Sequence, residues 1–547
     1  MERRLLIAVT LMVAVLVVPS FFRKPMPRRP LPRTDSASVR TGALPAPAQT
    51  GGRADTAATP PPPVAASLPT SLPADTASLA DARAVYRVTS LGATIDRAVF
   101  PQLRNFHPHD TGAANLVRQG DRLLVTRLLV GVDTVRFDSV PFAIEERGTV
   151  VRMRGRAGVV GQTVSFAPVA GQPYVLEVRG TIEGLEGRGA ALVVGLGTGF
   201  ANVEADSNDN YRSYSVAVRR NGVENTNFRS VDAGAVEALE GPFDWVAVKS
   251  KYFMGALLSA DSTQPQLGGA LLIGGPRPHR TATHTATWVT MPVGPDGQYR
   301  YQLYLGPKQH RVLHPMGRDL DVASPYGWIF RPIVMPVANW ITQLFLWTHE
   351  NLKLGYGMVL VVFGVLVRLM LWPLNQKAMK SQVAMMAVQP VLKDIQTRYK
   401  NDPQKLQGEM MRVYKEHNVN PLGGCLPLLL PMPILLALFF VFANTIELRG
   451  TPFLWLPDLS LRDPFFITPV VMGLSMFGLS KLSQIGMPPN PQAKMMTVFM
   501  PIMMTVLFLN FASGLNLYYA VSNIVSLPQQ WLINKSRAAE MARRQVT

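Results

Sequence analysis

An arginine lies within an apolar run that is long enough to cross a bilayer. Arg368 falls between Leu354 and Leu374, in the stretch VVFGVLVRLMLWPL. A charged side chain at mid-membrane costs about 2.5 to 3.5 kcal/mol on insertion scales, so such a residue is a functional candidate by default. Its chemistry would be that of a fixed cation that attracts carboxylates. Because Arg368 lies only about 9 Å along the helix from Leu374, the alternative is that it merely extends to the interface.

Further polar residues fall within the apolar segments near the C-terminus. They are Asn510, Asn516, Ser522, Asn523, Gln529 and Gln530. Polar groups that face inward from several helices would line a wet cavity open to the cytoplasm. The alternative is that they lie near helix ends and meet lipid headgroups, which fits Gln529 and Gln530 best. Prolines within these segments can bend the helices that would enclose such a cavity.

Six apolar segments are long enough to position these residues across a membrane. The first lies within residues 1–22, behind Arg3 and Arg4, and no small-residue cleavage site follows it, which indicates an uncleaved signal anchor. The other five are residues 353–374, 421–443, 465–485, 496–512 and 514–533. The composition agrees, since 48% of the residues are hydrophobic and only 16% are charged. The sequence therefore predicts a multi-pass membrane protein with six transmembrane helices.

A more polar stretch, residues 375–420, separates the first two of those five segments. Its apolar residues recur every three to four positions, and a break at Asn401 and Asp402 precedes Pro403, which suits the first turn of a second helix. We therefore predict a helical hairpin. Its methionines suit a surface that captures many different apolar partners, although core filling is the alternative for any one of them. They are Met379, Met385, Met386, Met410 and Met411.

Basic residues set the predicted orientation. The hairpin is rich in lysine and arginine, and the positive-inside rule places it in the cytoplasm. Alternation then places residues 444–464 outside, and the loop 486–495 and the basic tail 534–547 inside. The anchor taken alone would point the other way, because its outer flank is the more basic one. The opposite orientation would put the whole hairpin outside, so we predict that both termini are cytoplasmic.

A linker and one large domain lie between the anchor and the other spans. Residues 23–80 are rich in Pro, Ala, Ser and Thr and hold too few large apolar residues to fold, which predicts a disordered linker. Residues 81–319 contain short alternating runs, such as VVRMR from Val150 and YRYQLYLG from Tyr299, which are typical of all-β folds. About 240 residues of this kind predict a single β-sandwich, which lies outside the cytoplasm. The single cysteine, Cys425, excludes an intramolecular disulfide.

Residues 320–352 join this domain to the first of the five later spans. Trp328, Trp340 and Trp347 suit an amphipathic helix that lies in the membrane interface. A helix buried against the β domain is the alternative.

The order and spacing of these features match a known family. NPLGGCLPLLLPMPILLAL from Asn420, LPDLSLRDPFF from Leu456, MTVFMPIMMTVLFLNFASGLNLYYAVSN from Met496 and the arginine before LMLWPL together resemble the bacterial YidC membrane-protein insertase. The resemblance spans roughly Tyr326 to Ile533. The order of anchor, linker, β domain and helices is similar to that of the Gram-negative form, which has a large periplasmic domain.

The resemblance implies a fold and a role for the residues named above. It implies a β-supersandwich periplasmic domain that is largely dispensable for insertion, and a five-helix core with a hydrophilic groove closed to the periplasm. Arg368 would draw the polar outer end of a client into this groove, whose lining would include Gly364, where some relatives carry a threonine. The other groove residues would be Asn510, Asn516, Tyr519 and Asn523, and the client contacts would be Leu435, Met472, Leu507 and Tyr519.

The resemblance also implies location and partners. The protein would be a chaperone and insertase of the bacterial inner membrane that takes up nascent membrane proteins and releases them laterally into lipid. It would work alone or with the Sec translocon. The ribosome would dock through the basic tail and the cytoplasmic loops, membrane lipids would surround the helices, and DNA would play no part.

Other classes of function remain open from the residues themselves. A channel or secondary transporter would often show inverted repeats or paired intramembrane charges, and the sequence shows neither. A sugar-active envelope enzyme would place its chemistry in the β domain, where His107 and His109 are candidates and an exposed polar loop is the alternative reading. The sequence shows no convincing nucleophile, metal-ligand cluster or nucleotide loop. We therefore expect no catalytic residue, no metal and no cofactor, and a protein that is not an enzyme.

Overall fold

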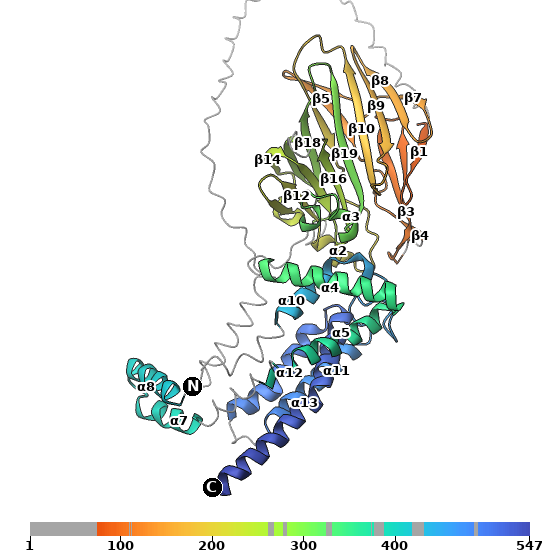
Figure 1. The fold of residues 1–547 in the computed structure, drawn as a ribbon. Coiled ribbons are helices and arrows are strands. Elements are labelled where there is room, and N and C mark those ends of the chain that lie inside the picture. The colour runs from red at the N-terminus through yellow and green to blue at the C-terminus, as the bar shows by residue number, and fades with distance from the viewer. Residues whose placement is uncertain are drawn as a thin grey trace, which may run out of the picture. The chain divides into compact units, whose positions relative to one another are not determined.

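The computed structural model describes the chain from Ala74 to Val546, with gaps (Figure 1). The residues that it does not describe are 1–73, 109, 111, 261–266, 277–281, 324–330, 374, 377–387, 418–431, 486–490 and 547. The predicted anchor and nearly all of the predicted linker therefore lie outside the described residues.

The described part of residues 76–307 forms three antiparallel sheets (Figure 1). Their strand orders are β1-β2-β3-β4, β13-β12-β15-β16-β19-β10-β9-β8-β7 and β14-β17-β18-β11-β5-β6. The strands are β1 (Thr76–Ala80), β2 (Val85–Thr89), β3 (Thr94–Asn105), β4 (Gly112–Asn115), β5 (Val125–Val130), β6 (Asp133–Arg136), β7 (Ala143–Glu146), β8 (Val151–Ala157), β9 (Val160–Pro168), β10 (Val175–Glu183), β11 (Ala190–Gly195), β12 (Ser215–Arg219), β13 (Val223–Asn227), β14 (Val236–Phe243), β15 (Trp245–Lys249), β16 (Phe253–Ser259), β17 (Leu267–Gly274), β18 (Thr285–Pro292) and β19 (Gln298–Pro307). Because β1 begins at Thr76, the folded domain starts inside the segment predicted as linker.

Alternating side chains explain why these segments form strands. In β8, buried and exposed residues alternate from Val151 to Arg156, as expected when one face of a sheet covers a core. Strand β16 differs, because every residue of it is buried. One hydrophobic core runs through all three sheets and includes Tyr86, Trp245 and Leu272. The predicted β-sandwich is confirmed, and His107 lies in the loop after β3, where it is half-buried.

Short helices lie between and after the strands of the β domain. They are α2 (Ser207–Arg212), η1 (Phe228–Ser230), α3 (His310–Leu313) and η2 (Leu320–Ala323). The indole Nε1 of Trp245 donates a hydrogen bond to the carbonyl of Arg318 at 2.7 Å, and the guanidinium of Arg318 donates to the carbonyl of Ser259 at 2.8 Å. These bonds hold the segment after β19 against the sheet.

The described part of residues 331–546 is mainly helical. The helices are α4 (Arg331–Leu352), α5 (Tyr356–Met370), α7 (Gln389–Arg398), α8 (Pro403–Glu416), α10 (Met432–Asn444), α11 (Ile467–Ser483), α12 (Pro491–Phe508) and α13 (Ser513–Val546). All of these except α7 and α8 contribute to a second hydrophobic core, whose members include Phe363, Leu438 and Met472. Helix α13 continues through residues 534–546, which were predicted as a tail after the last span.

Within the described residues, none of these helices has by itself both the length and the apolarity needed to cross a membrane. Helices α4 and α5 meet both conditions only when taken together, and the pair is bent by 118°. Met432–Asn444, Ile467–Ser483 and Thr497–Phe508 are shorter apolar helices. The count of six transmembrane helices therefore stays a prediction.

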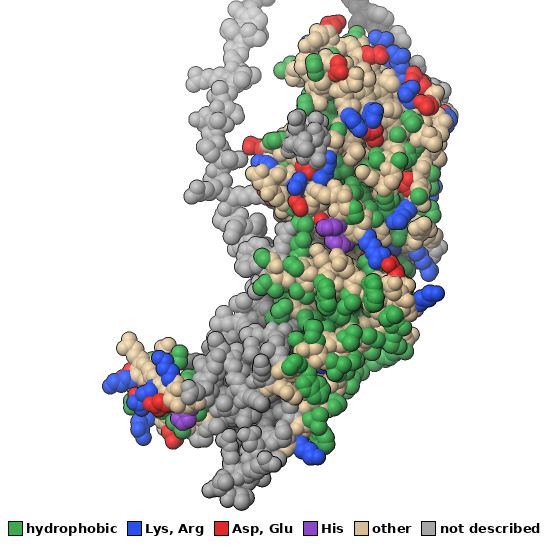
Figure 2. All heavy atoms as spheres, viewed as in Figure 1, with side chains coloured by type: hydrophobic (Ala, Val, Ile, Leu, Met, Phe, Trp, Pro, Cys, Tyr) green, Lys and Arg blue, Asp and Glu red, His purple; other side chains and the backbone are tan. Residues whose placement is uncertain are grey.

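Apolar side chains also gather on the outside of the helical part. Figure 2 shows hydrophobic side chains crowded over α4 and α5, whereas charged side chains are scattered over the β domain. Trp340, Trp347 and Leu366 are each more than half exposed. Patches of this kind mark surfaces that meet another protein or a membrane.

Helices α7 and α8 lie in the stretch predicted as a hairpin. The break falls at Asn401 and Asp402, and the side chain of Asp402 caps α8 by accepting a hydrogen bond from the backbone N–H of Lys405 at 3.1 Å. The two helices share a small apolar cluster that includes Leu392 and Val413.

The segment between α10 and α11, residues 445–466, is held by two aspartates of the motif LPDLSLRDPFF. Asp463 accepts hydrogen bonds from the backbone N–H groups of Phe465 at 3.0 Å and Thr468 at 2.7 Å, and so caps the start of α11. Asp458 accepts bonds from the backbone N–H and the hydroxyl of Ser460, both at 2.8 Å. The segment is therefore ordered by its own polar side chains.

Candidate functional site

The site is built where α5 lies against α13. A Cβ placed on Gly364 would lie 3.2 Å from a methyl carbon of Val521 and 3.6 Å from the hydroxyl oxygen of Ser522. The small residue therefore lets the two helices approach closely. One helical turn further along α5, Arg368 reaches the same face of α13.

The guanidinium of Arg368 has a neutral partner. Its Nε donates a hydrogen bond to the hydroxyl of Ser526, which in turn donates to the carbonyl of Ser522 at 2.6 Å. Among the described residues, no carboxylate lies within ion-pair distance of Arg368. The arginine is thus half-buried between apolar helices as a cation without an internal counter-ion.

Other polar side chains of α13 are also buried. Asn523 is 6% exposed and donates a hydrogen bond to the hydroxyl of Ser475 on α11 at 3.2 Å. Gln529 is 3% exposed, and its amide nitrogen has no hydrogen-bond partner among the residues that the structure describes. A buried amide without a partner costs about 1 to 3 kcal/mol, so water or another polar group is expected there. The alternative that Gln529 and Gln530 lie near a helix end and meet lipid headgroups is wrong, because both side chains are buried and α13 continues to Val546.

The structure brings together some of the groove residues named from the sequence and separates others. Gly364 lies one helical turn before Arg368, and Tyr519, which is half-buried, and Asn523 lie on α13, the helix that Arg368 contacts. Asn516 is fully buried and donates to the carbonyl of Phe508 at 3.1 Å, so it caps the end of α12. Asn510 is exposed in the turn between α12 and α13 and does not reach Arg368. Its distance follows from the helix rise, since it lies more than a dozen residues from Ser526.

The residues named as client contacts also differ in exposure. Leu435 on α10, Leu507 on α12 and Tyr519 on α13 are half-buried at the edge of the second core. Met472 on α11 is fully buried in that core, so a client would reach it only after neighbouring side chains move. On the hairpin, Met411 is 51% exposed, Met410 is half-buried, and the other three methionines lie outside the described residues.

Two site residues were missed by sequence reasoning. Ser526 and Ser475 hold Arg368 and Asn523, respectively, yet serine is common within helices and carries no pattern of its own. The i, i+4 spacing of Ser522 and Ser526 was the available signal, because it places both hydroxyls on one helix face.

A β-sandwich followed by apolar helices is typical of a class of membrane protein that carries a large folded domain in addition to its helices. Residues 86–348 match the family model of the YidC periplasmic domain, and residues 347–540 match that of the 60Kd inner membrane protein. The chain belongs to the family of YidC membrane protein insertases. This is not a family of enzymes.

Two relatives with similar sequences support the same assignment. The membrane protein insertase YidC of Anaeromyxobacter dehalogenans is 34% identical over 397 residues, which cover 72% of this chain and 70% of that protein. The YidC insertase of Syntrophus aciditrophicus is 35% identical over 292 residues, covering 53% of this chain and 52% of that protein. The chain spans about half the length of the Syntrophus aciditrophicus protein and of other relatives that it matches over a similar range. A crystal structure of active YidC insertase with its first transmembrane domain resolved is 18% identical, covers 83% of this chain and 92% of its own, and has a TM-score of 0.34.

Proposed function

We propose that this protein is an insertase and chaperone for nascent membrane proteins. It takes their hydrophobic segments into a hydrophilic groove that is open to the cytoplasm, and releases them laterally into the lipid bilayer. The observation that carries the proposal is the half-buried charge of Arg368, which has a neutral hydroxyl as its partner and no carboxylate partner among the described residues.

The charge of Arg368 has no fixed carboxylate partner among the described residues, so it is available to attract a carboxylate of the client. A carboxylate placed about 4 Å from a guanidinium gains about 4 kcal/mol at an effective dielectric constant near 20, against about 1 kcal/mol in water. A client with an acidic outer end would therefore be drawn toward Arg368. Gly364, Tyr519 and Asn523 would line the path, and the unpaired amide of Gln529 would hold water along it.

The exit into lipid would follow the half-buried apolar residues. Leu435, Leu507 and Tyr519 lie at the edge of the helical core, where a client helix could slide past them. Asn510 is left out of the groove, because it lies in an exposed turn. Met472 would take part only if the core opens. The exposed thioether of Met411 suits the first capture of a client by the hairpin.

The topology and the partners belong to the same proposal. The chain would cross the bacterial inner membrane six times, with both termini and the hairpin in the cytoplasm and the β domain in the periplasm. Helix α4 would lie in the interface, which its exposed Trp340 and Trp347 support. The Sec translocon and the ribosome would be partners in insertion. The client's own hydrophobicity and the proton-motive force would supply the drive.

The test is insertion into liposomes that contain the purified full-length protein. The client is a small single-span protein with an acidic outer tail, and the variants are Arg368→Ala and Arg368→Lys. The control is Arg462→Ala, which removes an exposed arginine between α10 and α11. We expect the wild type, Arg368→Lys and the control to insert the client, and Arg368→Ala to lose at least tenfold in rate.

Two results would contradict the proposal. If the wild type inserts nothing, the insertase function is wrong for this client. If Arg368→Ala inserts the client as well as the wild type does, Arg368 has no role in insertion and its side chain only extends to the membrane interface. Ion flux in the same liposomes without a client distinguishes a channel from an insertase.

A further inference from the structure

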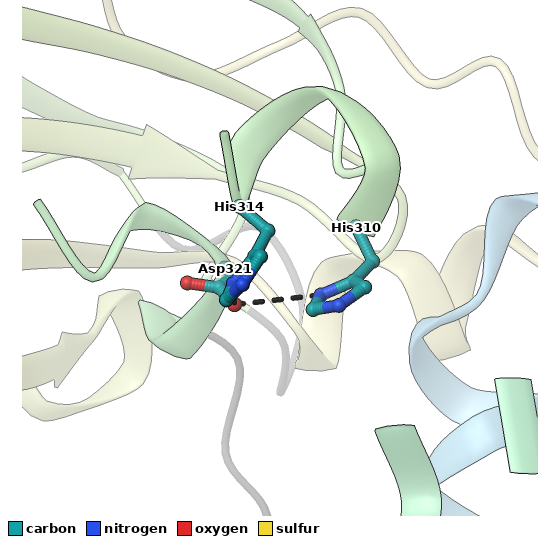
Figure 3. A group of neighbouring side chains, drawn as sticks. All are labelled: His310, His314 and Asp321. Atoms are coloured by element: carbon teal, nitrogen blue, oxygen red, sulfur yellow. Dashed lines mark hydrogen bonds and ion pairs between the residues drawn. The ribbon is translucent and has the colours of Figure 1, made fainter. Parts of the chain in front are cut away.

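Two imidazoles and one carboxylate meet at the C-terminal end of the β domain (Figure 3). His310 begins α3, His314 follows at its end, and Asp321 lies in η2. Nδ1 of His310 lies 3.4 Å from Oδ2 of Asp321, and Nδ1 of His314 lies 3.0 Å from the same oxygen. One ligand atom from each residue falls within 4.8 Å of the other two. The three side chains therefore point at a common centre.

Local structure explains this convergence. His310 and His314 are four residues apart, so a helical turn places both rings on one face, where their centroids lie 4.8 Å apart. The chain then reverses through Gly317, Arg318 and Asp319, whose φ angles are 67°, 61° and 54°. Two of these residues carry side chains, for which a left-handed conformation is unfavourable. The reversal returns Asp321 to the two imidazoles.

Hydrogen bonds from residues outside the cluster hold this chain reversal in place. Trp245 and Ser259 bond the backbone and the side chain of Arg318, and the guanidinium of Arg219 bonds the carboxylate of Asp319 at 3.0 Å. The buried Nζ of Lys249 donates to the carbonyl of Ala323. The three side chains thus stand on a backbone that is fastened to the sheet, which is the kind of support that a preformed binding site needs.

The spacing suits a small divalent ion. Tetrahedral zinc has bonds of about 2.0 to 2.2 Å to nitrogen and oxygen, which places ligand atoms about 3.3 to 3.6 Å apart. The observed separations of 3.0 and 3.4 Å are close to this edge length. The side chain of Asp321 is 11% exposed and that of His310 is 19% exposed, whereas that of His314 is 68% exposed. The cluster is therefore sheltered on one side and open to solvent on the other.

We propose that His310, His314 and Asp321 bind a divalent transition-metal ion of the zinc class, with water in the remaining position. Imidazole nitrogen suits zinc, copper and nickel, and a carboxylate adds the negative charge. Binding would join α3 to η2 and so fix the end of the β domain directly ahead of the segment that leads to α4.

The electrostatics of Asp321 agree with this assignment. Burial favours its neutral form, but contacts with His310 and His314 outweigh burial and hold the pKa of the carboxyl below its ordinary value. The group is therefore ionised at neutral pH and available as a ligand. Protons compete with a metal ion for imidazole nitrogens in general, so affinity would fall as the pH decreases.

The test is a zinc titration of the full-length protein in detergent, purified through a tag without histidine and stripped of metal. A chromophoric chelator competes for Zn²⁺ and reports affinity, and the visible absorption of Co²⁺ reports tetrahedral coordination. We expect one ion per chain. His310→Ala and Asp321→Asn should each weaken binding at least tenfold, since even an outer-shell partner contributes tenfold or more.

The controls remove other candidate ligands and guard against misfolding. His284→Ala and Cys425→Ser should bind as the wild type does. Because the side chain of His314 is largely exposed, His314→Ala should fold normally and still weaken binding at least tenfold. The proposal is overturned if the wild type binds Zn²⁺ no more tightly than the His310→Ala, His314→Ala double variant, or if bound Co²⁺ gives no tetrahedral spectrum. The cluster would then be an ion pair only.

Discussion

Arg449 and Glu204 form a buried ion pair between positions 245 residues apart in the chain. The guanidinium Nε donates to Oε2 of Glu204 at 2.7 Å, and the two side chains are 3% and 8% exposed. The same guanidinium donates to the carbonyls of Arg104 and Val203, both at 2.7 Å, and lies 4.5 Å from the ring centroid of Phe106. Burial raises the pKa of Glu204, and the charge of Arg449 opposes this effect. The segment between α10 and α11 is thus fastened to the β domain by a cation with several partners.

Removal of this cation should be costly. Arg449→Ala leaves the carboxylate of Glu204 buried and unpaired, for which we expect a loss of about 3 to 5 kcal/mol in the free energy of unfolding. Denaturant unfolding of the full-length protein in detergent, followed by tryptophan fluorescence, measures this loss. As a control, Arg154→Ala breaks the pair with Glu183, in which the side chains are 55% and 51% exposed, and should cost no more than about 1 kcal/mol.

A double variant separates the pair from the packing around it. Arg449→Met combined with Glu204→Met removes both charges while keeping apolar volume. We expect it to be more stable than Arg449→Met alone, because no unpaired charge stays buried. Equal stability of the two variants would mean that the ion pair contributes nothing beyond packing.

Lys249 provides a prediction about pH. Its side chain is 3% exposed, its Nζ bonds the carbonyl of Ala323, and no described carboxylate pairs with it. Burial, with a smaller contribution from Lys308, lowers the pKa of Lys249 well below its ordinary value of 10.5. The unfolded chain therefore binds more protons between the two pKa values, so stability should rise with pH across this window.

Lys249→Met should remove this contribution. We expect the variant to be more stable than the wild type by about 1 to 3 kcal/mol at neutral pH, with a difference that shrinks as the pH approaches 10.5. Thermal unfolding at several pH values measures the difference. A constant difference across the alkaline range would show that Lys249 does not titrate in the folded protein.

Gly514 provides a prediction about packing. A Cβ at this position would lie 2.4 Å from the ring of Phe442 and 3.1 Å from the carbonyl oxygen of Leu459. Gly514→Ala should therefore cost about 1 to 3 kcal/mol through overpacking, measured as a lower unfolding temperature. Phe442→Leu should recover part of the loss when it is combined with Gly514→Ala. Gly408→Ala, at an exposed position of α8 with open space around it, is the matched control.

Ser526 provides a prediction about the proposed site. Ser526→Ala removes the hydroxyl that positions Arg368, and a hydrogen bond to a charged group contributes about 1.5 to 3 kcal/mol. We expect a several-fold lower insertion rate for a client with an acidic outer tail and little change for a client with a neutral tail. Ser483→Ala, which removes a hydroxyl that bonds only within α11, is the control. An equal loss for both clients would indicate a structural role for Ser526.

Local patterns in the sequence predicted much of the fold. Alternation in β8, the cap formed by Asp402 and the apolar helices all follow from neighbouring residues. Contacts between residues that are far apart in the sequence could not be predicted, because periodicity carries no information about distant partners. Nothing in the order of residues links Arg449 to Glu204, and the reversal at Gly317 had to be seen before Asp321 could be placed beside His310. The burial of Met472 and the exposure of Asn510 likewise depend on how helices pack.

Helix α13 links the proposed site to the last residues of the chain. It runs over 34 residues, which at 1.5 Å per residue gives a rod about 50 Å long. The hydrocarbon layer is about 30 Å thick, so a helix lying across it would extend well beyond one surface. Ser526, which bonds the guanidinium of Arg368, lies on the same continuous helix as residues 534–546. A movement of those residues would therefore reach the proposed site through a single helix.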